Sequence, residues 1–143
     1  MFSSAQTMTF GRPQSFANVY SRVGVETGVN TASAHRLIEM LFDGFIESVT
    51  QARGAMRARQ IEPKGRAIMR AARIVEEGLK AGLNMEEGGK LAEDLSALYA
   101  YVAVRLTYAN LKNDESALEE CFRLINPLRE AWASIGPQVE GKA

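Results

Sequence analysis

Apolar residues recur every three or four positions in four separate stretches of the chain, and this period limits the possible folds more than any other feature. Such spacing places apolar side chains on one face of an α-helix. No stretch alternates apolar and polar residues as a half-buried strand does. The sequence therefore predicts an all-α protein. In the first stretch the apolar face consists of Phe42, Phe45, Val49, Ala52 and Met56.

The residues that flank these stretches predict where each helix begins and ends. Ser33 can cap the first helix, because its hydroxyl can accept a hydrogen bond from the free amides of the first turn. Pro63 suits the first turn of the second helix, Asn113 the end of the third, and Asp114 the cap of the fourth. Short connections between consecutive helices predict an antiparallel four-helix bundle. The helices are expected over about residues 33–60, 63–83, 90–112 and 114–135.

A shorter amphipathic segment precedes the bundle and carries Val19, Tyr20 and Val23. We expect it to be helical and to pack on the bundle, in one of two roles. It is either a temporary cover over an apolar groove or a permanent cap on one end of the bundle. The bundle domain is expected over residues 17–136, with flexible tails at 1–16 and 137–143.

Composition excludes several classes of function. The chain of 143 residues has 17 basic and 17 acidic residues, so its formal net charge is zero. This balance argues against a nucleic-acid partner held by long-range electrostatics. The N-terminus has no signal-peptide pattern, and no apolar stretch of about 18 residues is available for membrane insertion. We therefore expect a cytoplasmic protein. Cys121, the single cysteine, is expected to be a buried thiol without a disulfide or metal partner.

The sequence offers no constellation of catalytic or metal-binding residues. His35 is the single histidine, and with Glu39 four residues later it is interpreted as a helix-surface pair. The acidic doublets at 76–77, 86–87 and 119–120 are interpreted as solvated faces, since neighbouring residues on a helix point in different directions. No serine or cysteine lies in a nucleophile motif. We expect neither catalytic residues, nor a metal, nor a cofactor, and hence no enzyme.

The third predicted helix is more apolar than a helix at a bundle surface needs to be. Its apolar residues form two stripes about 130° apart around the helix. One stripe can face the core, whereas the other either packs on a neighbouring helix or waits for a partner. The first stripe is Leu91, Leu95, Leu98, Val102 and Ala109, and the second is Ala97, Tyr101, Val104, Tyr108 and Leu111.

The second predicted helix carries a row of small residues on the side away from its core stripe. The row is Ala67, Ala71, Ile74, Gly78 and Ala81. Small side chains let another backbone approach closely, as recognition of a helix in a groove requires. We therefore predict a partner-binding groove that combines the two helices, lined by Ala71, Ile74, Gly78, Tyr101, Val104, Tyr108 and Leu111.

Several runs of residues resemble the family of flagellar export chaperones called FliS. They are residues 35–44 (HRLIEMLFDG), 78–83 (GLKAGL), 88–89 (GG), 95–101 (LSALYAY) and 109–114 (ANLKND), followed by Ala131 and Trp132. Tyr20 fits the tyrosine of the family's N-terminal segment. Ala34 departs from the pattern, because the family often has proline there.

The resemblance implies a four-helix bundle that binds the disordered C-terminal segment of newly made flagellin. Binding would stop premature polymerisation and keep flagellin competent for type III export. The segment around Tyr20 would occupy part of the groove until flagellin displaces it. The cytosolic domain of the flagellar export gate would be a second partner. The alternative is a structural or regulatory bundle that self-associates as a homodimer through the second stripe of the third helix. For the chaperone itself, a weak homodimer is a further partner to test.

Overall fold

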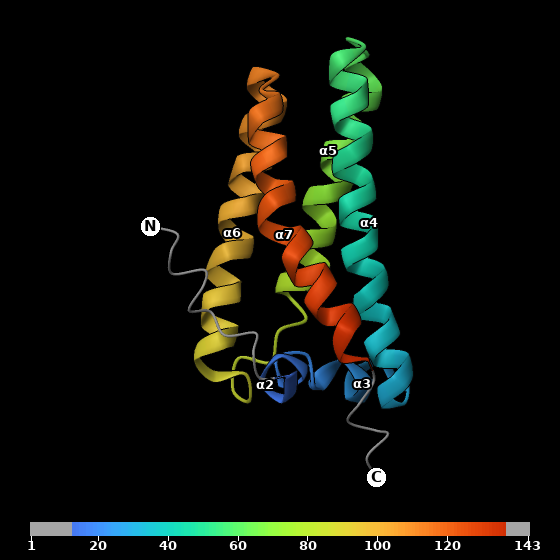
Figure 1. The fold of residues 1–143 in the computed structure, drawn as a ribbon, viewed down its shortest axis with the longest axis vertical. Helices are drawn as coiled ribbons and strands as arrows, with labels where there is room; N and C mark the ends of the chain where they lie inside the picture. Colours follow the sequence, from blue (N-terminus) through green and yellow to red (C-terminus); the bar gives the residue numbers. More distant parts are fainter. Residues whose placement is uncertain (1–12, 137–143) are drawn as a thin grey trace.

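Four long helices run up, down, up and down beside one another (Figure 1) in the computed structural model of the chain, which describes residues 13–136. The predicted all-α antiparallel bundle is confirmed. Helices α4 and α6 lie diagonally opposite each other, with α5 and α7 between them. The bundle helices are α4 (Thr31–Arg57), α5 (Ile61–Arg73), which continues as the π-helix η1 (Ile74–Lys80), α6 (Gly89–Lys112) and α7 (Glu115–Ile135).

The helix ends follow local capping chemistry. The side chain of Asn30 accepts a hydrogen bond from the Ser33 amide at 2.8 Å, so Asn30 caps α4 and Ser33 does not. Asn113 ends α6 in the left-handed conformation with φ 52°. Asp114 caps α7 by accepting from the Ser116 amide at 2.9 Å. The predicted roles of Asn113 and Asp114 are thus confirmed, and that of Ser33 is wrong.

The second bundle helix changes its geometry halfway along. Ala71, Val75, Leu79 and Leu83 are buried at intervals of four residues. A regular α-helix of 3.6 residues per turn would rotate such a row away from the core. The π-helix η1 has wider turns, with hydrogen bonds between residues five apart, and therefore keeps the row facing inward.

The core lies along the axis of the bundle and receives side chains from every long helix. On α6, Leu95, Val102 and Ala109 of the first predicted stripe are fully buried, while Leu91 and Leu98 are partly buried. Tyr99 and Leu106 of the same helix are fully buried as well. Burying each large apolar side chain contributes roughly 1.5–3 kcal/mol to folding, so this core holds the helices in place.

Two short helices, α2 (Pro13–Asn18) and α3 (Arg22–Thr27), pack at one end of the bundle. Phe16 on α2 is fully buried, and its ring meets Trp132 edge-on with centroids 5.2 Å apart. The tail expected at 1–16 therefore overlaps α2 at its last residues. Residues 1–12 and the tail expected at 137–143 lie outside the described residues.

Within residues 13–136, no helix is long and apolar enough to cross a membrane. The same part of the chain holds no group of three or more His, Cys, Asp or Glu residues placed to bind a metal ion. Cys121 is buried, as predicted, and its burial raises the pKa of the thiol to about 12. The thiol is consequently protonated at neutral pH and unreactive.

Candidate partner-binding face

The second stripe of α6 faces away from the core. Val104 and Leu111 are 66% and 74% exposed, and Tyr101 and Tyr108 are 42% and 41% exposed. Ala97, one turn earlier, is exposed as well. Of the two alternatives for the second stripe of the third helix, packing on a neighbouring helix inside the bundle is therefore wrong. An exposed row of large apolar side chains on one helix marks a surface for interaction.

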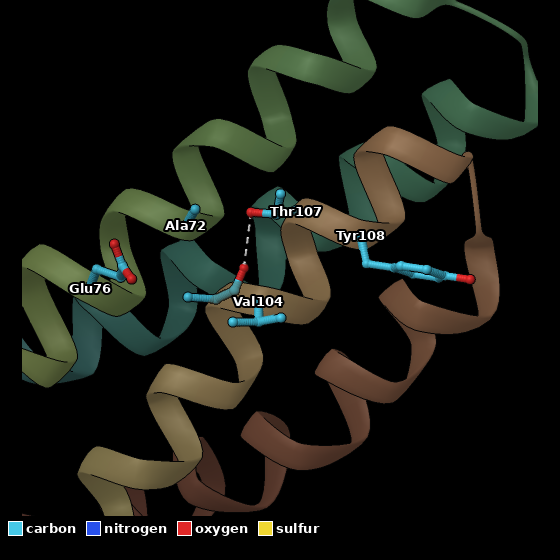
Figure 2. A pocket seen from close by; sticks show the side chains of 6 residues that line it. Ala72, Glu76, Val104, Thr107 and Tyr108 are labelled. Atoms are coloured by element: carbon cyan, nitrogen blue, oxygen red, sulfur yellow. Dashed lines mark hydrogen bonds between the residues drawn. The ribbon is translucent and has the colours of Figure 1, made fainter.

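A pocket of about 380 Å³ lies between this face and the second bundle helix (Figure 2). Val104 and Tyr108 belong to both the exposed stripe and the pocket. The Thr107 hydroxyl donates to the Ala103 carbonyl at 3.2 Å, so its polar atom is already satisfied. Glu76 adds a carboxylate at the edge, and the pocket is otherwise suited to an apolar side chain. The lining residues are Ala72, Glu76, Ala103, Val104, Thr107 and Tyr108.

Two members of the row of small residues on the second helix, Ile74 and Gly78, pack against α4. A Cβ atom on Gly78 would lie 3.0 Å from both Cδ atoms of Leu41, and one on Gly44 would lie 3.2 Å from Cδ1 of Ile74. Ala71 is fully buried. The close approach that small side chains permit is thus used by α4 within the bundle. Ala72 and Glu76 line the pocket instead, and the assignment of Ala71, Ile74 and Gly78 to a partner surface stays a prediction.

A polar network from α7 supports the exposed face. The Tyr101 hydroxyl donates to Oε2 of Glu120 at 2.6 Å, and Nε of Arg105 donates to Oε1 of Glu120 at 2.8 Å. The Arg105 guanidinium lies 4.9 Å from the centre of the Tyr108 ring, within cation–π range. The hydrogen bond to Glu120 raises the pKa of Tyr101. Glu120 was expected on a solvated face, and this interpretation is wrong.

The N-terminal segment is anchored to the end of the bundle by Tyr20. Its hydroxyl donates to the Leu79 carbonyl at 2.8 Å and lies 2.9 Å from the Tyr99 hydroxyl. The Tyr20 ring also meets Trp132 edge-on at 5.5 Å. Burial raises the pKa of both tyrosines, which therefore stay protonated. Sequence reasoning missed Tyr99, whose position three residues before Val102 was the available signal.

The flanking residues add to this anchor. Val19 is fully buried, and its carbonyl accepts from the Asn84 amide at 2.7 Å. The Asn84 side chain donates to the Ser21 hydroxyl at 2.9 Å. Val23 is partly buried against the core. The segment has the arrangement of an end cap, and no residue of it lines the pocket beside α6. Its role as a displaceable cover stays a prediction.

His35 joins the two helix ends that meet at this cap. Its ring stacks on Trp132 with centroids 4.8 Å apart, and its Nε2 lies 2.9 Å from the Trp132 carbonyl. Nε1 of Trp132 in turn donates a hydrogen bond to the His35 carbonyl at 3.0 Å. Glu39 pairs with Arg36 instead. The predicted surface pair of His35 and Glu39 is therefore wrong.

These features define a class of protein: an antiparallel helical bundle with an exposed apolar face on one of its helices. A family model described as flagellar protein FliS matches residues 16–139, and the chain belongs to this family. The flagellar secretion chaperone FliS of Salmonella typhimurium is 45% identical over 119 residues, which cover 83% of this chain and 88% of the relative.

Two further relatives give the same result. The flagellar secretion chaperone FliSB of Pseudomonas aeruginosa is 42% identical over 116 residues, covering 81% of this chain and 91% of the relative. The flagellar secretion chaperone FliS of Bacillus subtilis is 29% identical over 107 residues, covering 75% of this chain and 78% of the relative. The predicted resemblance is confirmed. Because these relatives are secretion chaperones, the predicted non-enzymatic role in flagellar export is confirmed with it.

Proposed function

We propose that this chaperone binds the disordered C-terminal segment of flagellin along the outer face of α6. The exposed stripe of Tyr101, Val104, Tyr108 and Leu111 beside an apolar pocket is the observation that carries the proposal. Membership of the FliS family supports it. Bound flagellin cannot polymerise prematurely and stays competent for type III export from the cytoplasm.

The energetics favour an apolar segment that becomes ordered on binding. Ordering a disordered segment typically costs 2–5 kcal/mol or more. Each large apolar side chain that is fully buried returns roughly 1.5–3 kcal/mol. Several anchors are therefore needed. The exposed stripe supplies four in a row, with Val104 and Leu111 having the most surface left to bury.

The same function involves a second partner protein and a movement of the N-terminal segment. The loaded complex is recognised by the cytosolic domain of the flagellar export gate, and neither nucleic acid nor membrane insertion is involved. The segment with Val19, Tyr20 and Val23 leaves its site at the bundle end when flagellin wraps the chaperone. Departure of Tyr20 would uncover Tyr99 and Trp132, which the segment now covers.

Titration calorimetry with a peptide of the cognate flagellin C-terminal region tests the proposal, with light scattering before and after. We expect saturable one-to-one binding with a negative heat-capacity change, the mark of apolar burial. A chain that releases no heat with the peptide and scatters as a stable dimer would contradict it. The exposed stripe would then serve self-association, which is the alternative function.

A substitution pair locates the binding face. Val104→Asp places a charge in the stripe and should weaken peptide binding by at least tenfold, about 1.4 kcal/mol. Met40→Asp is the matched control, because Met40 is 52% exposed on α4, diagonally across the bundle. Circular dichroism should show wild-type helix content for both variants. Equal affinities of the two variants would place the binding face elsewhere.

A further inference from the structure

The carboxylate of Glu120 extends from α7 toward the outer face of α6. It bonds Tyr101 with one oxygen and Arg105 with the other, and Arg105 lies over the ring of Tyr108. These α6 residues are spaced by four and three, so they share one side of the helix. We propose that Glu120 is a positioning residue that sets the geometry of the flagellin-binding face. This role rests on the proposed function of that face.

The ion pair of Glu120 and Arg105 within this network is sheltered enough to hold a fixed geometry. Only 26% of the Arg105 side chain and 23% of the Glu120 side chain are exposed. By contrast, the neighbouring pair of Glu119 and Arg123 is 51% and 61% exposed, with its charged atoms 3.8 Å apart. Exposed pairs of that kind contribute little, whereas charge-assisted hydrogen bonds with short distances are strong and directional.

Fixing the rings before binding lowers the entropic cost of binding. A partner that buries a mobile side chain has to immobilise it, and this ordering weakens the complex. Tyr101 is held through its hydroxyl and Tyr108 through the guanidinium above its ring. Both tyrosines keep about two-fifths of their residue surface exposed and open to a partner. The free chaperone thus presents aromatic surfaces already in place.

The carboxylate also neutralises the one cation within the network. Covering an unpaired guanidinium with an apolar segment would carry a desolvation penalty. With Glu120 bound to Arg105, the face meets the partner as a paired, nearly neutral surface. Removal of the carboxylate should therefore weaken binding in two ways, through loose rings and through an uncompensated charge.

The test measures the affinity of the flagellin C-terminal peptide for Glu120→Gln and Glu120→Ala by calorimetry. We expect a roughly tenfold increase in Kd for each, equal to about 1.4 kcal/mol. Glu119→Ala, on the adjacent and more exposed residue, is the matched control and should bind as the wild type does. Circular dichroism and thermal unfolding show whether each variant keeps its fold, and Glu120→Gln preserves the side-chain volume.

A second readout separates positioning from a merely structural role. In the Arg105→Ala/Tyr101→Phe background, removal of Glu120 should change Kd no further, because its contacts are already gone. NMR titration of ¹³C-labelled tyrosine should show the pKa of Tyr101 lowered in Glu120→Gln relative to the wild type, since the carboxylate that raises it is absent.

The outcomes separate this inference from the function on which it rests. A wild-type chain that binds the peptide, together with Glu120 variants of unchanged Kd, would overturn the positioning role alone. Equal weakening by Glu119→Ala, or further weakening by Glu120→Ala in the background without its contacts, would overturn it too. A wild-type chain that does not bind the peptide would refute the proposed function, and the positioning role would fall with it.

Discussion

Tyr20→Phe should destabilise the chain although it removes a single oxygen atom. The tyrosine has one hydroxyl proton, which it donates to the Leu79 carbonyl. Tyr99 must therefore donate its own proton to the Tyr20 oxygen across the 2.9 Å that separates them. The substitution keeps the ring against Trp132 but leaves a buried carbonyl and a buried hydroxyl without these partners.

The expected magnitude follows from those two groups. Leaving a buried polar group unsatisfied costs about 1–3 kcal/mol, and we expect a loss of about 2 kcal/mol of unfolding free energy, the lower end of the range for two such groups. For a chain of this size that corresponds to a decrease in Tm of roughly 4–8 °C. Tyr99→Phe should cost only about 1 kcal/mol, because Tyr20 still donates to Leu79. The double variant should be no less stable than Tyr20→Phe, because it no longer contains the buried Tyr99 hydroxyl that lacks its partner in the single variant.

Urea unfolding followed by circular dichroism measures all four chains of this cycle. Because the two hydroxyls are in direct contact, the losses of unfolding free energy in the two single variants should not add up to the loss in the double variant. If the two single losses instead summed in the double variant, the tyrosines would act independently. A Tyr20→Phe variant as stable as the wild type would likewise refute the reasoning, because it would show that the buried pair contributes nothing to holding the N-terminal segment.

Two other predictions concern the end of the bundle opposite this segment. Lys64 is 6% exposed and donates to the Asn110 carbonyl at 3.0 Å and to Oδ1 of Asn113 at 2.6 Å. Lys64→Met should therefore lower the free energy of unfolding, measured in urea, by about 2 kcal/mol. An unchanged urea midpoint would contradict the role of Lys64 as a cap of α6. The hydrogen bond from Arg57 lowers the pKa of Glu115 below 4.5. A group with a lowered folded pKa stabilises the fold above its unfolded pKa and loses that effect as pH falls through the folded value. Wild-type stability should hence decrease between about pH 5 and pH 3 more steeply than that of Glu115→Gln, and parallel curves would exclude this contribution.

The bundle could be predicted from sequence because its signals are local and repeated. The end of α6 at Asn113 and the cap at Asp114 follow from the chemistry of single residues. The cap of α4 was harder to predict, because Asn30, Thr31 and Ser33 all carry a side chain able to accept a hydrogen bond from a free amide. Only the backbone geometry shows that Asn30 accepts and that Ser33 supplies the amide.

The candidate site was only half predictable. Periodicity separated the outward stripe of α6 from its core stripe, and Val104 and Leu111 are indeed exposed. Periodicity does not say which neighbour a row of small residues meets, and Gly78 meets Leu41 of α4. The π-helix η1 also changes the helical register of this segment, because its turns are wider than those of an α-helix. The apolar residues at intervals of four, from Ala71 to Leu83, were the signal for it in the sequence.

The acidic doublet on α7 shows why sequence alone could not complete the site. Glu119 and Glu120 are chemically identical neighbours, and a helix turns about 100° between them. This rotation leaves Glu119 in solvent and brings Glu120 to Tyr101 and Arg105. An apolar stripe predicts where a partner can be buried, but the packing of α7 beside α6 determines which carboxylate fixes that stripe. The carboxylate that fixes the face therefore belongs to a different helix from the side chains that make it apolar.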